Sequence, residues 1–174
     1  MSAKWYMLTV IGKDRSGIVS HVTAALFDCG CNLGEATMAR IGGNFTIMLM
    51  VQYDGKAQAL IKNIEPVIES LDLHAHVDTI KAELHRHQVP DVNISVYGAD
   101  RAGIVAQVTM ALTEAGLNIL GLETDVAGSE LQPIYVMNIE GQATQGIASL
   151  QAALDIMADD GIDTALTPIE TMIG

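Results

Sequence analysis

Two short motifs whose residue types could hold a small anion occur twice in this chain. Residues 12–19 read Gly-Lys-Asp-Arg-Ser-Gly-Ile-Val, and residues 98–105 read Gly-Ala-Asp-Arg-Ala-Gly-Ile-Val. Each motif is followed by Gly-x-Asn, at residues 30–32 and 116–118. A loop that opens a helix presents unpaired backbone N–H groups and the positive end of the helix dipole, which together suit a carboxylate or a phosphate. The motifs therefore predict an anion-binding loop in each half of the chain.

The charged and glycine residues of this loop have distinct expected roles. Asp14 and Asp100 are expected to cap the N–H groups at the helix start. Gly17 and Gly103 let backbone or ligand approach without a Cβ in the way. Arg101 is the only Lys or Arg in residues 88–174, so its place in the motif indicates a specific partner, either a ligand carboxylate or a structural acid.

The asparagine of the second motif has the chemistry to hold an amino acid. Asn32 and Asn118 each follow a glycine that is expected to end a helix. An asparagine can offer its carbonyl to an amino group and its amide to a carboxylate. A purely structural interpretation is also open, in which the loop is a capped helix start with a local ion pair and Gly-x-Asn is a C-cap followed by a turn.

The two motifs belong to a longer internal repeat. Residues 8–32 and 94–118 share 13 of 25 positions at a constant offset of 86. A repeat of this period indicates two copies of one supersecondary unit. We therefore predict two domains, at residues 1–86 and 87–174, joined through a polar connector at 84–91.

Hydrophobic periodicity predicts the same elements in both copies. Ile18, Val19, Val22, Ala25 and Leu26 form one apolar helical stripe, and Pro66 is a fault in the second helix. The expected elements of the first copy are strands at 5–11, 33–41, 45–53 and 74–83 and helices at 18–30 and 56–71. Those of the second are strands at 93–97, 119–127, 134–139 and 162–170 and helices at 102–115 and 145–160.

The order of these elements is βαββαβ in each copy. It predicts a ferredoxin-like α+β sandwich, with a four-stranded antiparallel sheet and two helices on one face. A glycine-rich turn at 42–44 should close the first hairpin, because glycine and asparagine tolerate positive φ. The second hairpin, across 128–133, is expected to have a longer loop.

Charge and composition exclude several classes of function. The net charge of −12 divides into −1 for residues 1–87 and −11 for residues 88–174. Such an acidic chain is a poor nucleic-acid binder, so direct DNA binding is not expected. The longest apolar stretch, residues 45–51, is too short for a membrane span, and the start lacks the h-region of a signal peptide. A cytoplasmic protein is expected.

Neither a metal site nor a cofactor is expected. His74, His76, His85 and His87 lie close together in the sequence, but no Cys or carboxylate completes an evident ligand set, so the expected role is plain surface residues; metal binding stays an open alternative. Cys29 and Cys31 flank Gly30 and are expected to be buried structural thiols rather than a soft-metal or redox site.

An enzyme is not expected either. Catalysis would need a nucleophile with its base, paired carboxylates or a metal set, and none occurs in both copies. Ser20 and His21 of the first copy are replaced by Ala106 and Gln107 in the second.

The motifs in their βαββαβ frame resemble the ACT domain, a regulatory module that binds amino acids. The resemblance rests on Asp-Arg-x-Gly-Ile-Val between a strand and a helix and on Gly-x-Asn at the helix exit. Two such domains over nearly the whole chain resemble the glycine cleavage system transcriptional repressor family. That resemblance implies a regulator that senses glycine and contacts an activator protein rather than DNA.

The resemblance also implies where a ligand lies. In ACT domains small ligands typically sit where two domains abut, between the first loop of one and the second strand of its neighbour. The residues carried over are Asp14, Arg15, Ser16, Gly17, Ile18 and Asn32 in the first copy and Asp100, Arg101, Ala102, Gly103, Ile104 and Asn118 in the second. Because Ser16 becomes Ala102, a hydroxyl is lost, and the two sites are expected to differ in affinity or one to be vacant.

We therefore expect a regulatory protein that binds glycine or another small amino acid and acts through a protein partner such as a transcriptional activator. One alternative is a regulatory subunit that allosterically controls an amino-acid metabolic enzyme. Another is a structural assembly module with empty pockets. A homodimer is expected, because each sheet has open edges and one face without helices.

Overall fold

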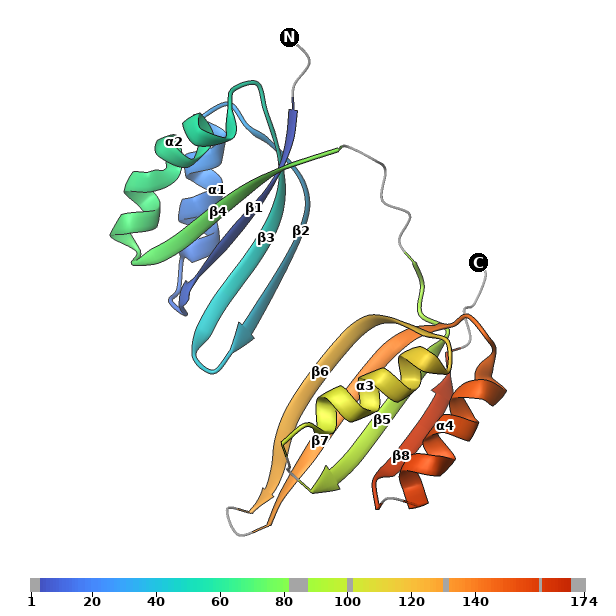
Figure 1. The fold of residues 1–174 in the computed structure, drawn as a ribbon. Helices are drawn as coiled ribbons and strands as arrows, with labels where there is room; N and C mark the ends of the chain where they lie inside the picture. Colours follow the sequence, from blue (N-terminus) through green and yellow to red (C-terminus); the bar gives the residue numbers. More distant parts are fainter. Residues whose placement is uncertain (1–3, 82–87, 100–101, 130–131, 160, 170–174) are drawn as a thin grey trace. The chain divides into compact units, whose positions relative to one another are not determined.

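The computed structural model describes residues 4–81, 88–99, 102–129, 132–159 and 161–169. The chain forms two compact units, Met1–His85 and Arg86–Gly174, and each is described by itself. Both have the predicted βαββαβ order, and in both the two helices cover one face of a four-stranded antiparallel sheet (Figure 1). The predicted fold class is confirmed.

The first unit forms its sheet in the order β2-β3-β1-β4. Its elements are β1 (Lys4–Lys13), α1 (Ile18–Asp28), β2 (Asn32–Ile41), β3 (Asn44–Tyr53), α2 (Ala57–Ser70) and β4 (Leu73–Ile80). The second unit has the equivalent order β6-β7-β5-β8. Its elements are β5 (Val92–Ala99), α3 (Ile104–Glu114), β6 (Leu117–Ser129), β7 (Gln132–Ala143), α4 (Ile147–Asp159) and β8 (Asp163–Pro168).

Each core lies between a sheet and its two helices. Alternate residues of the two central strands point at the helices, which is the period expected of a sheet with one buried face. In the first unit the buried set is Tyr6, Leu8, Val10, Phe45, Ile47, Leu49 and Val51 from the strands and Ile18, Val22, Leu26, Leu60, Ile64 and Ile68 from the helices. Val19, predicted in the apolar stripe of α1, is 40% exposed, so the buried stripe is narrower than predicted.

The predicted fault at Pro66 does not end its helix, since α2 continues to Ser70. Pro66 lies on the exposed side of the helix, where water can satisfy the carbonyl that its missing N–H would have bonded. The predicted strand at 74–83 starts one residue earlier and ends at Ile80, and residues 82 and 83 lie outside the described residues.

The hairpins confirm one turn prediction and correct another. Gly42 and Gly43 have φ of 57° and 75°, which suits a tight two-residue turn between Ile41 and Asn44. The prediction of a longer loop across 128–133 is wrong, because β6 and β7 stay paired out to Ser129 opposite Gln132. Pro133 has no backbone N–H to donate to a neighbouring strand. The described pairing of β7 with β5 ends at Ile134, so the pairing that is described does not require an N–H group at residue 133.

In the described part of the chain no helix has the length and apolar character that crossing a membrane requires.

Candidate functional site

The first loop connects β1 to α1, and Gly17 is its pivotal residue. Gly17 is the N-cap of α1 with φ of 89°, in the left-handed region that L side chains rarely adopt. Its carbonyl accepts hydrogen bonds from the His21 backbone N–H at 3.0 Å, the Ser20 hydroxyl at 2.8 Å and His21 Nδ1 at 2.7 Å. The glycine is therefore required for backbone geometry, whether or not a ligand is bound.

The prediction that Asp14 caps the helix is wrong, because no described side chain makes a cap hydrogen bond to α1. The Asp14 carboxylate accepts a hydrogen bond from Arg40 Nε at 2.7 Å and forms an ion pair with Arg40 Nη2. The Asp14 backbone N–H donates to the Gly43 carbonyl at 2.9 Å. Asp14 lies four residues before α1, level with the β2–β3 hairpin, so a strand residue reaches its carboxylate and the loop is fastened to that hairpin.

A concave surface of about 590 Å³ lies beside this loop. It is lined by Asp14, Arg15, Ser16, Gly17, Ile18, Val19, Ser20, Met38, Arg40 and Phe45. The structure thus brings the five predicted loop residues together and adds Arg40 and Met38 from β2. Two guanidinium groups and the N-terminus of α1 border this surface, which suits a carboxylate.

Arg40 was missed by the sequence analysis. Its charge was visible, but it lies 26 residues from Asp14 and only strand pairing brings the two together. In β2 Arg40 is opposite Phe45, whose side chain is buried on the helix-covered face. Because paired residues share a face, Arg40 is directed to the side of the sheet on which α1 begins.

Asn32 lies at the other end of the unit. It is opposite Gln52 in β3, and its Nδ2 donates to Gln52 Oε1 at 3.3 Å. The first loop follows Lys13, which is opposite Asn44. Eight residues of β3 separate Asn44 from Gln52, or about 27 Å of extended strand. One unit therefore does not bring its own loop and its own asparagine together.

The second copy repeats the backbone geometry of the first. Gly103 is the N-cap of α3 with φ of 87°, and its carbonyl accepts from the Gln107 N–H at 2.9 Å. Asp100 and Arg101 lie outside the described residues. Ala102 is exposed and Ile104 is buried, like Ser16 and Ile18 in the first copy.

Asn118 at the start of β6 contacts the chain that precedes β5. Its Nδ2 donates to Gln88 Oε1 at 2.7 Å. Gln142, its strand partner, donates through Nε2 to the Val89 carbonyl at 3.0 Å. The segment just before β5 is thus fastened to the start of β6. The described contacts of Asn32 include no equivalent of this attachment.

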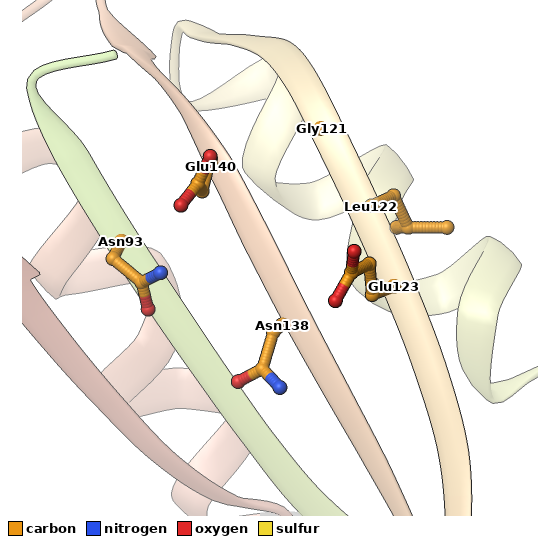
Figure 2. A pocket seen from close by; sticks show the side chains of 6 residues that line it. All are labelled: Asn93, Gly121, Leu122, Glu123, Asn138 and Glu140. Carbon is orange, nitrogen blue, oxygen red and sulfur yellow. The ribbon is translucent and has the colours of Figure 1, made fainter. Parts of the chain in front are cut away.

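A second pocket lies on the helix-free face of the second unit (Figure 2). It has a volume of about 300 Å³ and is lined by Asn93, Gly121, Leu122, Glu123, Asn138 and Glu140. Ser95 Oγ donates to Asn138 Oδ1 at 2.9 Å, which orients that amide. Two carboxylates here would repel the carboxylate of an amino acid, so the first loop is the better candidate for that ligand.

The residues of this second pocket come from three strands, and the sequence did not predict that they lie together. The available signal was alternation, since Val92, Ile94 and Val96 are buried and the residues between them must face away from the helices. Alternation places Asn93 on the outer face, but it does not reveal which side chains of other strands lie beside it.

The two cysteines were predicted to be buried, and the structure confirms this for Cys31 but not for Cys29. Cys31 is 7% exposed in the first core, and Cys29 is half-buried against it. Burial, and then the neighbouring Cys29, raise the pKa of Cys31 from 9.0 to about 11, so this thiol stays protonated at neutral pH. Burial also raises the pKa of Cys29, with a smaller contribution from Asp28.

The histidines of β4 lie on the exposed face of its alternating pattern. His74 and His76 are both exposed, and His76 Nε2 is 3.1 Å from Asp78 Oδ2. Within the described residues no three His, Cys, Asp or Glu side chains group as a metal would require. His85 and His87 lie outside the described residues.

Comparisons with known proteins agree with this architecture. The sequence model described as "ACT domain" matches residues 6–78. The glycine cleavage system transcriptional repressor of Escherichia coli strain K12 is 25% identical over 140 residues, covering 80% of this chain and 74% of the repressor. A UPF0237 protein of Lactococcus lactis is 32% identical over 72 residues, covering 41% of this chain and 83% of that protein.

A crystal structure of an unknown protein from Galdieria sulphuraria has the same fold over 97% of this chain and 99% of that one, with 24% identity and a TM-score of 0.73. The fold, the loop and helix-exit motifs in both halves, and the matched domain agree with one another. This chain is a tandem ACT-domain protein and belongs to the ACT-domain family.

Proposed function

We propose that this protein senses glycine or another small amino acid and regulates the transcription of glycine cleavage metabolism through contacts with another protein. The observation that carries the proposal is the resemblance to the Escherichia coli repressor, which extends over 80% of the chain and thus through both ACT units. The acidic second half supports a protein partner rather than DNA, because DNA affinity depends on Lys and Arg. We infer a regulator and not an enzyme, since the matched relative is by name a transcriptional repressor.

The amino-acid site is proposed at the loop motif and the helix-exit asparagine. In the first copy Arg15, Arg40 and the N–H groups at the start of α1 would hold the carboxylate, supported by Ser16, Gly17 and Ile18. Asp14 would act indirectly, because its carboxylate holds Arg40. The equivalent residues of the second motif are 100–104.

Asn32 or Asn118 would hold the other end of the amino acid. Since the loop and the asparagine of one unit lie at opposite ends of its sheet, a ligand that touches both needs the loop from one ACT unit and the asparagine from another. A homodimer would supply such pairs, which is why we propose one. Asn118 already donates to Gln88, so ligand binding there would compete with that contact.

The affinity for glycine is bounded by its size. Five heavy atoms at about 1.5 kcal/mol each give roughly 7.5 kcal/mol, which corresponds to a dissociation constant weaker than micromolar. Titrations therefore need millimolar amino acid. Such a ligand shifts a two-state equilibrium only by the difference between its affinities for the two states.

The test is calorimetric titration of the whole chain with a panel of amino acids. Asn118→Ala and Asn32→Ala are expected to weaken binding without unfolding the chain. Asn63→Ala is the matched control, because Asn63 is exposed on α2, where its Nδ2 donates to Tyr53 Oη at 3.2 Å, and it belongs to neither motif. Titration curves that stay unchanged for both site variants would refute the site assignment, and absence of heat with every amino acid would refute the sensor.

The proposed role in transcription is tested by identifying the protein that this chain binds in the cell. Affinity purification of the tagged chain from its native cell, with and without millimolar glycine, is expected to recover a transcription regulator. Recovery of an amino-acid metabolic enzyme instead would replace this proposal by control of that enzyme.

A further inference from the structure

A surface groove in the second unit runs along α3 between the loop motif and the helix-exit motif and is lined by residues of neither. It runs between α3 and α4, which lie side by side on one face of the sheet (Figure 1), and has a volume of about 360 Å³. Its lining is mostly small and apolar, with Ala111, Ala115, Ala152 and Ala153 along its sides. Ile156 at its border is 67% exposed and adds apolar surface to the groove.

The internal repeat shows that the fold does not require three of these alanines, while the fourth, Ala111, corresponds to Ala25 in the first unit. The buried residues Leu150 and Leu154 of α4 correspond to Leu60 and Ile64 of α2. In this alignment Ala152 and Ala153 replace the larger side chains that α2 carries at residues 62 and 63.

The equivalent positions of the first unit carry Lys62, Asn63 and Cys29, the last in place of Ala115. Asn63 is engaged there, since its Nδ2 donates to Tyr53 Oη at 3.2 Å. The first unit, with Lys62 and Asn63 at the positions of Ala152 and Ala153, folds in the same way. The groove therefore reflects the residues chosen in the second unit and not a constraint of helix packing.

The rim of the groove is acidic. Glu114 lines it, and Asp159, which is exposed, follows Ile156 by three residues and so lies on the same side of α4. Residues 88–174 hold 12 Asp and Glu against a single Arg, so the sequence of this unit offers almost no positive charge to offset the groove's acidic residues. An apolar floor between carboxylates is complementary to an apolar stripe between positive charges. It would repel nucleic acid and an anionic membrane.

We propose that this groove docks an amphipathic helix of a partner protein, with apolar side chains in the groove and Lys or Arg along its flanks. Alanine walls allow a third helix to approach closely, as in helix-in-groove recognition. The inference rests on the proposed function in that a sensor acting through protein contacts needs such a surface. A second copy of the groove is disfavoured as the occupant, because the two acidic rims would repel each other.

The test uses the full chain and a synthetic probe. The probe is a fluorescent helical peptide of about 14 residues with Leu at i, i+3, i+4 and i+7 and Lys at the flanks. A matched peptide with Glu in place of Lys is the control. Fluorescence anisotropy is expected to show saturable binding of the Lys peptide, weakened by salt, and no binding of the Glu peptide. Equal binding of both peptides, or of neither, would overturn the proposal.

Larger neutral side chains in the groove would distinguish docking of the peptide in the groove from nonspecific electrostatic attraction to the acidic unit. Ala152→Gln with Ala153→Asn is expected to weaken peptide binding at least about tenfold, a change of roughly 1.4 kcal/mol. The control is Ala24→Gln with Ala59→Asn, which makes the same two changes at exposed alanines of α1 and α2 in the first unit and should leave binding unchanged. Unchanged binding in the groove variant would overturn the proposal.

Two charge variants complete the test. Glu114→Lys in the groove and Asp125→Lys on β6 change the net charge equally, but Asp125 is opposite Val136 on the helix-free side of the sheet. Docking requires the larger loss from Glu114→Lys, and equal losses would mean nonspecific attraction. Sedimentation of the groove-filled variant checks for an interface between copies, and a dissociated dimer with unchanged peptide binding would overturn the proposal.

Amino-acid titration of the groove-filled variant keeps the two proposals apart. Retained heat of binding is expected, since Ala152 and Ala153 lie on α4 and belong to neither the loop motif nor the helix-exit motif. Loss of peptide binding with retained amino-acid binding supports the groove alone, whereas a chain that binds the peptide but no amino acid contradicts only the sensor.

Discussion

Alanine at Gly17 and alanine at Gly103 are expected to destabilise their units by different amounts. Both glycines have φ near 90°, where an L residue costs about 1–2 kcal/mol. The lower entropy of the unfolded chain with alanine offsets about 0.4–1 kcal/mol of that cost. Gly103 has open space where a Cβ would lie, so Gly103→Ala should cost roughly 0.5–1 kcal/mol in all.

Gly17→Ala should cost more, because its Cβ would lie 3.2 Å from Cε1 and Nδ1 of His21. The His21 ring would have to move and loosen its 2.7 Å contact with the Gly17 carbonyl, an exposed hydrogen bond worth about 0.5–1 kcal/mol. The total is then about 1–2 kcal/mol. With a urea slope of about 1 kcal/mol/M, the midpoint should fall by roughly 1–2 M.

The two units can be followed separately in the whole chain. The only tryptophan, Trp5, lies in β1 and reports unfolding of the first unit. Hydrogen exchange of α3 peptides reports the second unit. Adding His21→Gln, the residue at the equivalent position 107, should bring the cost at Gly17 toward that at Gly103. If Gly103→Ala made the second unit more stable than in the unsubstituted protein, the cost assigned to the positive φ would be refuted. If Gly17→Ala and Gly103→Ala reduced stability equally, the contribution assigned to the His21 side chain would be refuted.

Two further predictions concern stability. Cys31 favours its neutral form in the folded state, with a pKa raised from 9.0 to about 11 by burial and then by Cys29. The stability of the first unit is therefore fully present below about pH 9 and should fall by about 2 kcal/mol as the pH rises to about 11. Trp5 fluorescence in urea across this range measures the fall, which Cys31→Ala should largely remove, and a fall of equal size in that variant would contradict the assignment. Asp72 has φ of 54° at the end of α2, where the second unit has Gly161 with φ of 79°. Asp72→Gly should raise the urea midpoint by about 0.5–1 M, corresponding to about 0.5–1 kcal/mol; an unchanged or lower midpoint would show that this backbone is not strained.

Local rules on a single chain were enough to predict the fold. The β-rich apolar runs at residues 5–11 and 45–53 and the helical spacing from Ile18 to Leu26 depend only on neighbours in the sequence. The Gly42-Gly43 turn is equally local, because two positive φ values suffice to define it. The sequence was less accurate where tertiary contacts or solvent decided the outcome. The second helix continues past Pro66, which lies on the water-exposed side of α2, and the pairing of β6 with β7 extends to Ser129 and Gln132.

The sequence by itself determined the two ACT units, their motifs and the unequal charge of the halves, because each is a property of residue order. Only the tertiary structure decided what the motif residues contact. Asp14 meets Arg40 through strand pairing over 26 residues, and Asn32 is carried to the far end of the sheet from its own loop. The groove between α3 and α4 likewise depends on which helix faces oppose each other. Spacing along a chain specifies an element, but distance between side chains on different elements is set only when those elements pack.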